Sequence, residues 1–166
     1  HSKLTRRGAL AAAASLGAAA AMDRLSATAR AADAAQPDYI DAHVHVWSPD
    51  TERWPLAEGY SKADMLPPSF TPDELLAQAR PVGVRRIVLI QMSFYRFDNR
   101  YMLQAMADHP GTFGGVGIVD HTAPHPQRAM AALAKQGVRG FRIVAGQSDP
   151  FHWLEHPGYH AMWRYA

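Results

Sequence analysis

His43 and His45 are the residues of this chain whose type and spacing most directly suggest chemistry. They lie near the end of the largely apolar run 39–47 (YIDAHVHVW). In a β-strand, residues two apart project from the same face, roughly 6 to 7 Å apart along it. Two neutral imidazoles placed in this way can bind one divalent ion and leave coordination positions for water and substrate. The spacing alone also fits two histidines that are solvated or packed in a core, so the surrounding sequence must decide.

Three further residues are candidates for binding a substrate. Arg142 shares a face with Gly140 in the run 138–144, and its planar fork of donors matches a carboxylate. Gln91 lies near the carboxyl end of a second apolar run, and Tyr95 follows in the next loop. The alternatives are a structural ion pair for Arg142, an apolar environment for Gln91 and a surface position for Tyr95.

The remaining histidines carry weaker signals. His121 and His125 follow the third apolar run and could line a pocket, although a solvated loop is the simpler interpretation. His152, His156 and His160 are spaced by four residues, which would place three imidazoles on one helix face. Pro157 favours a helix start after His156, so we interpret these three histidines as structural.

The elements that must position these side chains alternate between strands and helices. This alternation is typical of an α/β fold with a mainly parallel sheet. Thr71, Pro72 and Glu74 form the signature of a helix start, and Gly137 that of a helix end. We predict strands at 39–46, 86–93, 113–119 and 138–144, and helices at 71–80, 99–109, 126–136 and 157–166.

Residues 1–35 read as an export signal rather than as part of the fold. Arg6 and Arg7 precede an alanine-rich, weakly apolar stretch and small residues suited to cleavage, an order that resembles the twin-arginine (Tat) signal. An amphipathic helix of the domain or a membrane anchor is the alternative. The apolar stretch is too short to span a bilayer, so we expect no stable membrane insertion after signal removal, and a periplasmic or secreted location.

Composition narrows the function classes further. The whole chain has a formal net charge of +2, but residues 1–35 hold five basic and two acidic side chains, which leaves −1 for the remainder. A net charge of −1 does not indicate a surface that binds nucleic acid. The sequence has no cysteine, so disulfides, thiolate ligands and cysteine nucleophiles are excluded, and any metal must be bound by histidine and carboxylate.

Four motifs together resemble the amidohydrolase superfamily. They are DAHVHVW at 41–47, VLIQ at 88–91 followed by Asp98 and Asn99, GVGIVD at 115–120, and GVRGFR at 137–142. Within the superfamily the chain is most similar to the amidohydrolase-2 group, which includes 2-pyrone-4,6-dicarboxylate lactonase. The resemblance implies a (β/α)₈ TIM barrel, of which residues 36–166 would form the first half, about four strand-helix units.

The resemblance also implies a function and a site. His43 and His45 would be catalytic and would bind one divalent metal ion, with zinc expected, while Arg142, Tyr95 and Gln91 would bind a small anionic or lactone substrate. The alternative is that the enzyme works without a metal and that the histidines themselves polarise the substrate. The implied reaction is hydrolysis of a lactone or similar carbonyl compound. The alternatives are a metal-dependent decarboxylase of the same superfamily and a non-catalytic truncated product.

The family's further histidines and its general-base aspartate follow later strands of the barrel, and the sequence offers no matching positions. We therefore expect the 166-residue chain alone to be inactive. The sequence predicts no oligomeric state.

Overall fold

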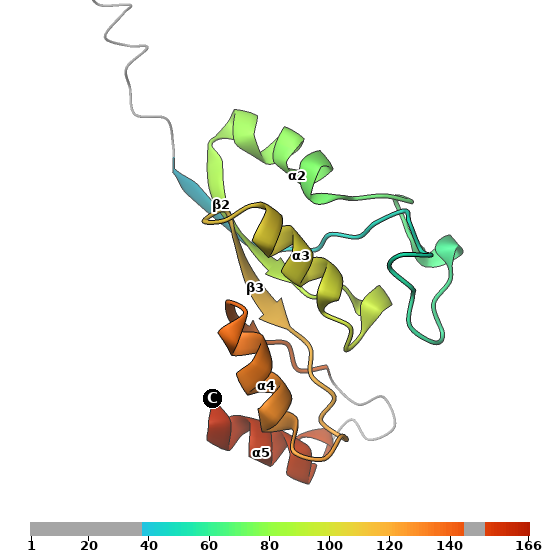
Figure 1. The fold of residues 1–166 in the computed structure, drawn as a ribbon, viewed down its shortest axis with the longest axis vertical. Coiled ribbons are helices and arrows are strands. Elements are labelled where there is room, and N and C mark those ends of the chain that lie inside the picture. The colour runs from blue at the N-terminus through green and yellow to red at the C-terminus, as the bar shows by residue number, and fades with distance from the viewer. Residues whose placement is uncertain (1–37, 145–151) are drawn as a thin grey trace, which may run out of the picture. The chain divides into compact units, whose positions relative to one another are not determined.

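The computed structural model describes residues 38–144 and 152–166. In these ranges four parallel strands form one sheet, with the strands adjacent in chain order (Figure 1). The strands are β1 (Tyr39–Val44), β2 (Val84–Ile90), β3 (Phe113–Gly117) and β4 (Val138–Phe141). Helices alternate with them, so the predicted α/β fold with a parallel sheet is confirmed.

The helices begin and end close to where the sequence signals place them. They are α2 (Pro72–Ala79), α3 (Arg100–Asp108), α4 (Pro126–Lys135) and α5 (Pro157–Tyr165), with short 3₁₀ turns at Lys62–Asp64, Arg80–Val82, Ser93–Tyr95 and Trp153–Glu155. Thr71 and Glu74 form the predicted capping box of α2. Gly137 has φ 95°, the left-handed conformation that follows many helix ends.

The main core lies between the sheet and its helices. Ile87 and Leu89 of β2 are 1% and 0% exposed, and they belong to one cluster with Leu75 of α2 and Met102 of α3. Figure 1 shows α3 and α4 running alongside the strands in this layer. Val88, on the other face of β2, is only partly buried. Ile90, on the same face as Val88, is 9% exposed, so buried residues occur on both faces of β2.

The strands end earlier than their apolar patterns predict. β1 ends at Val44, β2 at Ile90 and β4 at Phe141. Hydrogen bonds to β3 nevertheless continue for one residue, since the amide N of Gln91 donates to Val116 O and that of Arg142 to Gly117 O, both at 2.8 Å. Gln91 and Arg142 thus lie directly after the last residues of β2 and β4.

The long segment between β1 and α2 folds back onto the sheet. Trp47 and Phe70 form an isolated antiparallel bridge, and the indole of Trp47 donates to the carbonyl of Pro67 at 2.9 Å. A smaller cluster, which includes Met130 and Met162, joins α4 to α5. No helix in 38–144 or 152–166 combines the length and apolar character needed to cross a membrane. The predicted export signal, 1–35, lies outside the described residues.

Candidate functional site

The strand ends bring several candidate residues to one edge of the sheet. His45 follows β1, Gln91 directly follows β2, and Arg142 directly follows β4. Because the strands are parallel, their carboxyl ends lie at the same edge, which is where α/β sheets and barrels place their ligand sites.

The imidazoles of His43 and His45 converge at this edge. Their Nε2 atoms are 3.3 Å apart and their ring planes are inclined by 84°. Nδ1 of His45 lies 2.9 Å from the carbonyl oxygen of Ile90. A carbonyl can only accept, so Nδ1 carries the proton and Nε2 of the neutral ring keeps its lone pair. A hydrogen bond from the second ring nitrogen is the usual way in which a metal-ligating histidine is oriented.

The pair fits two ligands of one metal ion. Two nitrogens bound at about 2.0 to 2.1 Å in tetrahedral geometry stand about 3.3 Å apart. Burial lowers the pKa of His45 and outweighs the hydrogen bond to Ile90, and the charges of Arg142 and His43 lower this pKa further. His45 is therefore neutral at pH 7, as a metal ligand must be. Within 38–144 and 152–166, no third side chain of histidine, cysteine or carboxylate type joins the pair.

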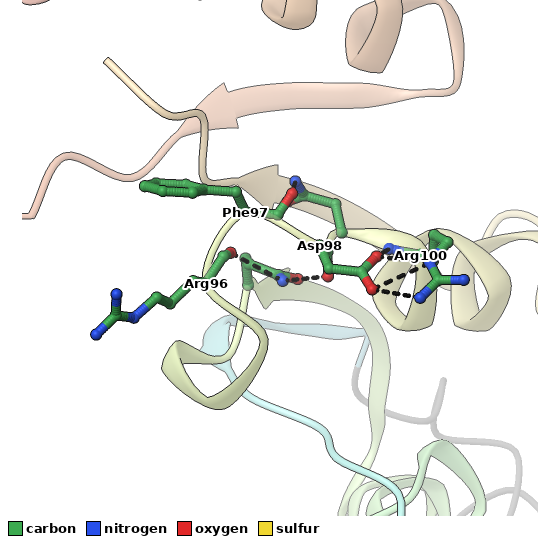
Figure 2. A network of polar contacts seen from close by, with 6 residues as sticks. Arg96, Phe97, Asp98 and Arg100 are labelled. Carbon is green, nitrogen blue, oxygen red and sulfur yellow. Dashed lines mark hydrogen bonds and ion pairs between the residues drawn. The ribbon is translucent and has the colours of Figure 1, made fainter. Parts of the chain in front are cut away.

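Gln91 supports a loop and does not face a substrate. It is 1% exposed, and its Nε2 donates to the carbonyls of Arg96 and Asp98 at 3.2 and 2.8 Å. Figure 2 shows these hydrogen bonds, together with the carboxylate of Asp98 turned toward Arg100. The structure thus assigns Gln91 to the shape of the loop after β2, in place of the predicted substrate contact.

Tyr95 is likewise part of the interior. It is 4% exposed, and its hydroxyl accepts a hydrogen bond from the amide N of Ser48 at 3.0 Å. Burial raises the pKa of Tyr95, so the hydroxyl stays protonated. The predicted role in orienting a substrate does not fit this position, because the ring packs in the main core cluster.

Asn99 is a positioning residue that the sequence reasoning missed. It is 6% exposed, its Nδ2 donates to the carbonyls of Phe97 and Ile118, and its Oδ1 accepts from the amide N of Ile118. These three bonds, of 2.9 to 3.0 Å, tie the loop after β2 to the end of β3. A Cβ on Gly117 would lie 3.0 Å from Asn99 Oδ1, which explains the small residue there.

Arg142 does lie where a substrate could reach it. It contributes to a cavity of about 370 Å³ over the ends of β3 and β4. The polar side chains of its wall are Tyr60, Ser93, Arg96, His121, Arg142 and Tyr159. The charge of Arg142 also lowers the pKa of His45, so the cavity and the histidine pair are electrostatically connected.

The other histidines separate into a wall residue and structural residues. His121 lies in the cavity wall, stacked on Tyr159 with ring centroids 4.0 Å apart, which differs from the favoured solvated loop. Burial, then the neighbouring His156, lowers the pKa of His121. His156 begins α5, where its Nδ1 accepts from the amide N of Gly158. His152 lies 2.9 Å from the Glu155 carboxylate. Both contacts fit the structural interpretation of these two histidines, which stays a prediction.

Comparison with known proteins identifies what this arrangement is similar to. The sequence profile of the amidohydrolase family, Amidohydro_2, matches residues 40–166. A Pseudomonas putida structure, provisionally named a 2-pyrone-4,6-dicarboxylic acid hydrolase, is 31% identical with a TM-score of 0.50, covering 63% of this chain and 36% of its own.

Two more distant structures share the fold. One, from Acinetobacter baumannii, has the same provisional name and was solved with citric acid bound; it is 24% identical with a TM-score of 0.60, over 76% of this chain and 44% of its own. The other, an apo protein from Agrobacterium tumefaciens, is 21% identical with a TM-score of 0.54, over 69% of this chain and 39% of its own. The chain therefore spans less than half the length of these structures, and its four strands form part of a TIM barrel.

Proposed function

Because this chain belongs to the amidohydrolase family, we propose that it forms part of a hydrolase that opens a lactone or a similar carbonyl substrate with an activated water. The provisional name of the 31% identical Pseudomonas putida protein supports this substrate class. That structure is much longer than this chain, so we propose that further residues of the barrel supply the remaining histidines and the general-base aspartate.

The observation that carries the proposal is the convergence of His43 and His45 beside a cationic cavity. Their Nε2 atoms stand 3.3 Å apart at the carboxyl edge of the sheet. The hydrogen bond to Ile90 holds the His45 ring in the tautomer whose Nε2 can bind a ligand. The His45 ring is therefore oriented by the protein itself before any ligand binds.

His43 and His45 would hold a divalent ion, with zinc expected. Such an ion supplies Lewis acidity that polarises the substrate carbonyl. The protein's own part is to orient the two imidazoles and to keep His45 neutral, and burial of His45 contributes to this. Without a metal, Nε2 of His43 could donate a hydrogen bond to the carbonyl oxygen, whereas Nε2 of the neutral His45 ring can only accept.

Arg142 would orient an anionic substrate in front of the histidine pair. Its backbone is fixed by the hydrogen bond to Gly117, so the side chain starts from an ordered position at the strand end. A guanidinium binds a carboxylate through two parallel hydrogen bonds, which defines both position and angle. Orientation of this kind lowers the barrier by bringing the reacting atoms together in advance.

The test begins with the gene and continues with the enzyme. We expect the codons after residue 166 to encode two histidines that follow further strands and a late aspartate. In the encoded protein, His43→Asn and His45→Asn should each lower the rate of lactone hydrolysis and the metal affinity by about tenfold to a hundredfold or more. Acid release and metal content measure the two effects.

His125→Asn is the matched control, because His125 is exposed, has φ 58° and asparagine tolerates that backbone. Its turnover should not change. Hydrolysis that persists in both variants of the pair would overturn the proposal, and release of carbon dioxide instead of acid would identify a decarboxylase. Turnover that survives chelation but needs both histidines would indicate the metal-free mode.

A further inference from the structure

β1 is irregular at the point where it carries the histidine pair. Between Asp41 and Val44 the register of β1 on β2 shifts. Three steps along β1 correspond there to two steps along β2, from Ile87 to Leu89, so β1 contains one extra residue. Such a β-bulge is rare between parallel strands, and bulges are over-represented next to active sites, where they re-aim a side chain. The extra residue falls within 42–43, so the bulge includes His43.

The backbone of His43 is held by the side chain of Asp41. The amide N of His43 donates to Oδ1 of Asp41 at 3.1 Å. A carboxylate that accepts from the amide two residues later is typical of turns, where it offers the backbone an alternative to a ladder partner. In β1 it does so at a bulge, where the ladder is locally disrupted. Because hydrogen bonds to a carboxylate are stronger than those between neutral groups, Asp41 fixes the course of the chain at His43.

The two rings of the histidine pair are oriented in different ways. Nδ1 of His45 donates to Ile90 O at 2.9 Å, so a hydrogen bond sets that ring. In the described ranges, the ring of His43 has no hydrogen-bonding partner other than His45. Val44 packs against the main core cluster, which anchors the chain directly after His43. The direction of the His43 side chain is consequently set by its own backbone, and Asp41 holds that backbone.

We propose that Asp41 is a positioning residue, whose carboxylate holds the backbone of His43 so that the Nε2 atoms of His43 and His45 stand 3.3 Å apart. The inference rests on the proposed function and deepens it, because it explains how the first histidine of the pair is placed. Residues on one face of a regular strand are separated by roughly 6 to 7 Å, so the two rings must tilt toward each other. The bulge supplies this change of direction, and Asp41 stabilises it.

Asp41 acts through His43 and is not itself a ligand. Among residues 38–144 and 152–166, no carboxylate combines with the two histidines into a group that could hold a metal ion. The role of Asp41 is therefore to support a ligand, as the hydrogen bond to Ile90 does for His45.

The experiment measures the zinc affinity of the encoded protein by competition with a coloured chelator. Asp41→Ala removes the acceptor and should weaken zinc binding about tenfold to a hundredfold, which is the usual effect of losing a group that orients a ligand. Asp41→Asn keeps an oxygen that can accept from the same amide, so it should restore most of the affinity.

Asp38→Ala is the matched control. Asp38 lies directly before β1, and its exposed carboxylate is 3.7 Å from the guanidinium of Arg86. Its removal takes the same charge from the same strand without affecting the His43 amide, so the zinc affinity should not change. Melting temperatures of the metal-free variants show that each one folds, and we expect Asp41→Ala to melt close to the unchanged protein.

A second measurement needs no metal. The rings of His43 and His45 are inclined by 84° with centroids 5.1 Å apart, so each ring shifts the NMR frequencies of the other's protons. In metal-free Asp41→Ala the ring protons of His43 should move toward the frequencies of a solvated histidine, whereas Asp41→Asn and Asp38→Ala should keep them. Nδ1 of His45 should stay protonated in all three variants, because the Ile90 carbonyl holds it.

Three results would overturn the inference. They are unchanged zinc affinity in Asp41→Ala, equal losses in Asp41→Ala and Asp41→Asn, which would make the carboxylate itself a ligand, and unmoved His43 ring frequencies in Asp41→Ala. If the unchanged protein binds no zinc, the ring frequencies alone decide.

The hydrolysis assay separates this inference from the proposed function. A displaced His43 ring in Asp41→Ala, in a protein that turns over no lactone, would keep the role of Asp41 and remove the hydrolase. Lactone turnover together with an unmoved ring in Asp41→Ala would do the reverse.

Discussion

Polar side chains after the strands divide into those that hold the loops and those that face the cavity. The first group is buried and satisfied by internal hydrogen bonds, while the second group lines the cavity wall. The first consists of Gln91, Tyr95 and Asn99, and the second of Arg96, His121 and Arg142. A polar group in the interior is costly without a partner, so each buried member fixes a specific loop conformation. The carboxyl edge of the sheet is therefore supported by buried, hydrogen-bonded side chains.

Tyr95→Phe tests this supporting role. The change removes the hydroxyl that accepts from Ser48 N and leaves a buried amide without a partner. We expect a loss of about 1 to 3 kcal/mol in the free energy of unfolding, measured by urea denaturation. Tyr165→Phe is the control, since Tyr165 is 45% exposed at the end of α5, and it should change stability by less than about 0.5 kcal/mol. Equal midpoints for both variants would contradict the assignment.

Residue types and spacing predict only part of this site. The alternation of His43 and His45 predicts a shared face, and the structure brings their Nε2 atoms together. The same alternation predicts that Gln91 faces the site. However, β2 ends at Ile90, one residue before Gln91, and the Gln91 amide donates to the loop that follows. The positive φ of Arg96 could not be predicted from the sequence either, because arginine rarely adopts such a backbone conformation.

Helix starts are specified by local chemistry, and α2 is the clearest case. Thr71 Oγ1 accepts from the amide N of Glu74, and the Glu74 carboxylate accepts from the amide N of Thr71 and from Ser69 Oγ. The first of these bonds to the carboxylate, from the Thr71 backbone, is the main reason that the pKa of Glu74 lies below its usual range. This box sets the direction in which the chain enters the helix.

Thr71→Ala should lower the free energy of unfolding by about 1 kcal/mol at pH 7, measured by urea denaturation. Glu74 adds a pH dependence with a definite sign. Its folded pKa is depressed, so its contribution is present above the ordinary glutamate pKa of about 4.3 and is lost as the pH falls through the lower folded value.

Glu74→Gln should flatten the stability profile over that acidic range. Asp73→Asn is the matched control, because Asp73 also lies in the first turn of α2 but outside the box. A Glu74→Gln profile that keeps the acid slope of the unchanged protein would contradict the account.

Strand ends are less predictable than helix starts for a physical reason. The apolar runs 39–46 and 138–144 continue past the last paired residues of β1 and β4. An apolar pattern indicates which side chains are buried, whereas the length of a strand depends on hydrogen bonds to the neighbouring strand. The order β1-β2-β3-β4 follows from alternation with helices, which favours parallel neighbours. Fold class could thus be predicted from the sequence, and the exact position of each rim residue could not.

Taken as a whole, the described sheet has open edges and uncovered apolar surface. β1 and β4 lie at its two edges, and Tyr39 and Ile40 of β1 are 59% and 52% exposed. A second cavity, of about 390 Å³, lies between α4, β4 and α5 and is lined mainly by apolar side chains such as Met130 and Phe141. In a complete barrel such edges and surfaces are paired and covered.

We therefore expect the 166-residue chain, taken alone, to self-associate through the β1 edge as its concentration rises from micromolar to millimolar. Ile40→Lys should shift the association to higher concentration, because a charge on an edge strand opposes pairing with another chain. Sedimentation velocity measures the shift. Val82→Lys is the control, since Val82 is 64% exposed but lies outside the strands. If Val82→Lys were as effective as Ile40→Lys, general charge repulsion rather than the open edge would control assembly, and a chain that stayed monomeric throughout would exclude edge pairing altogether.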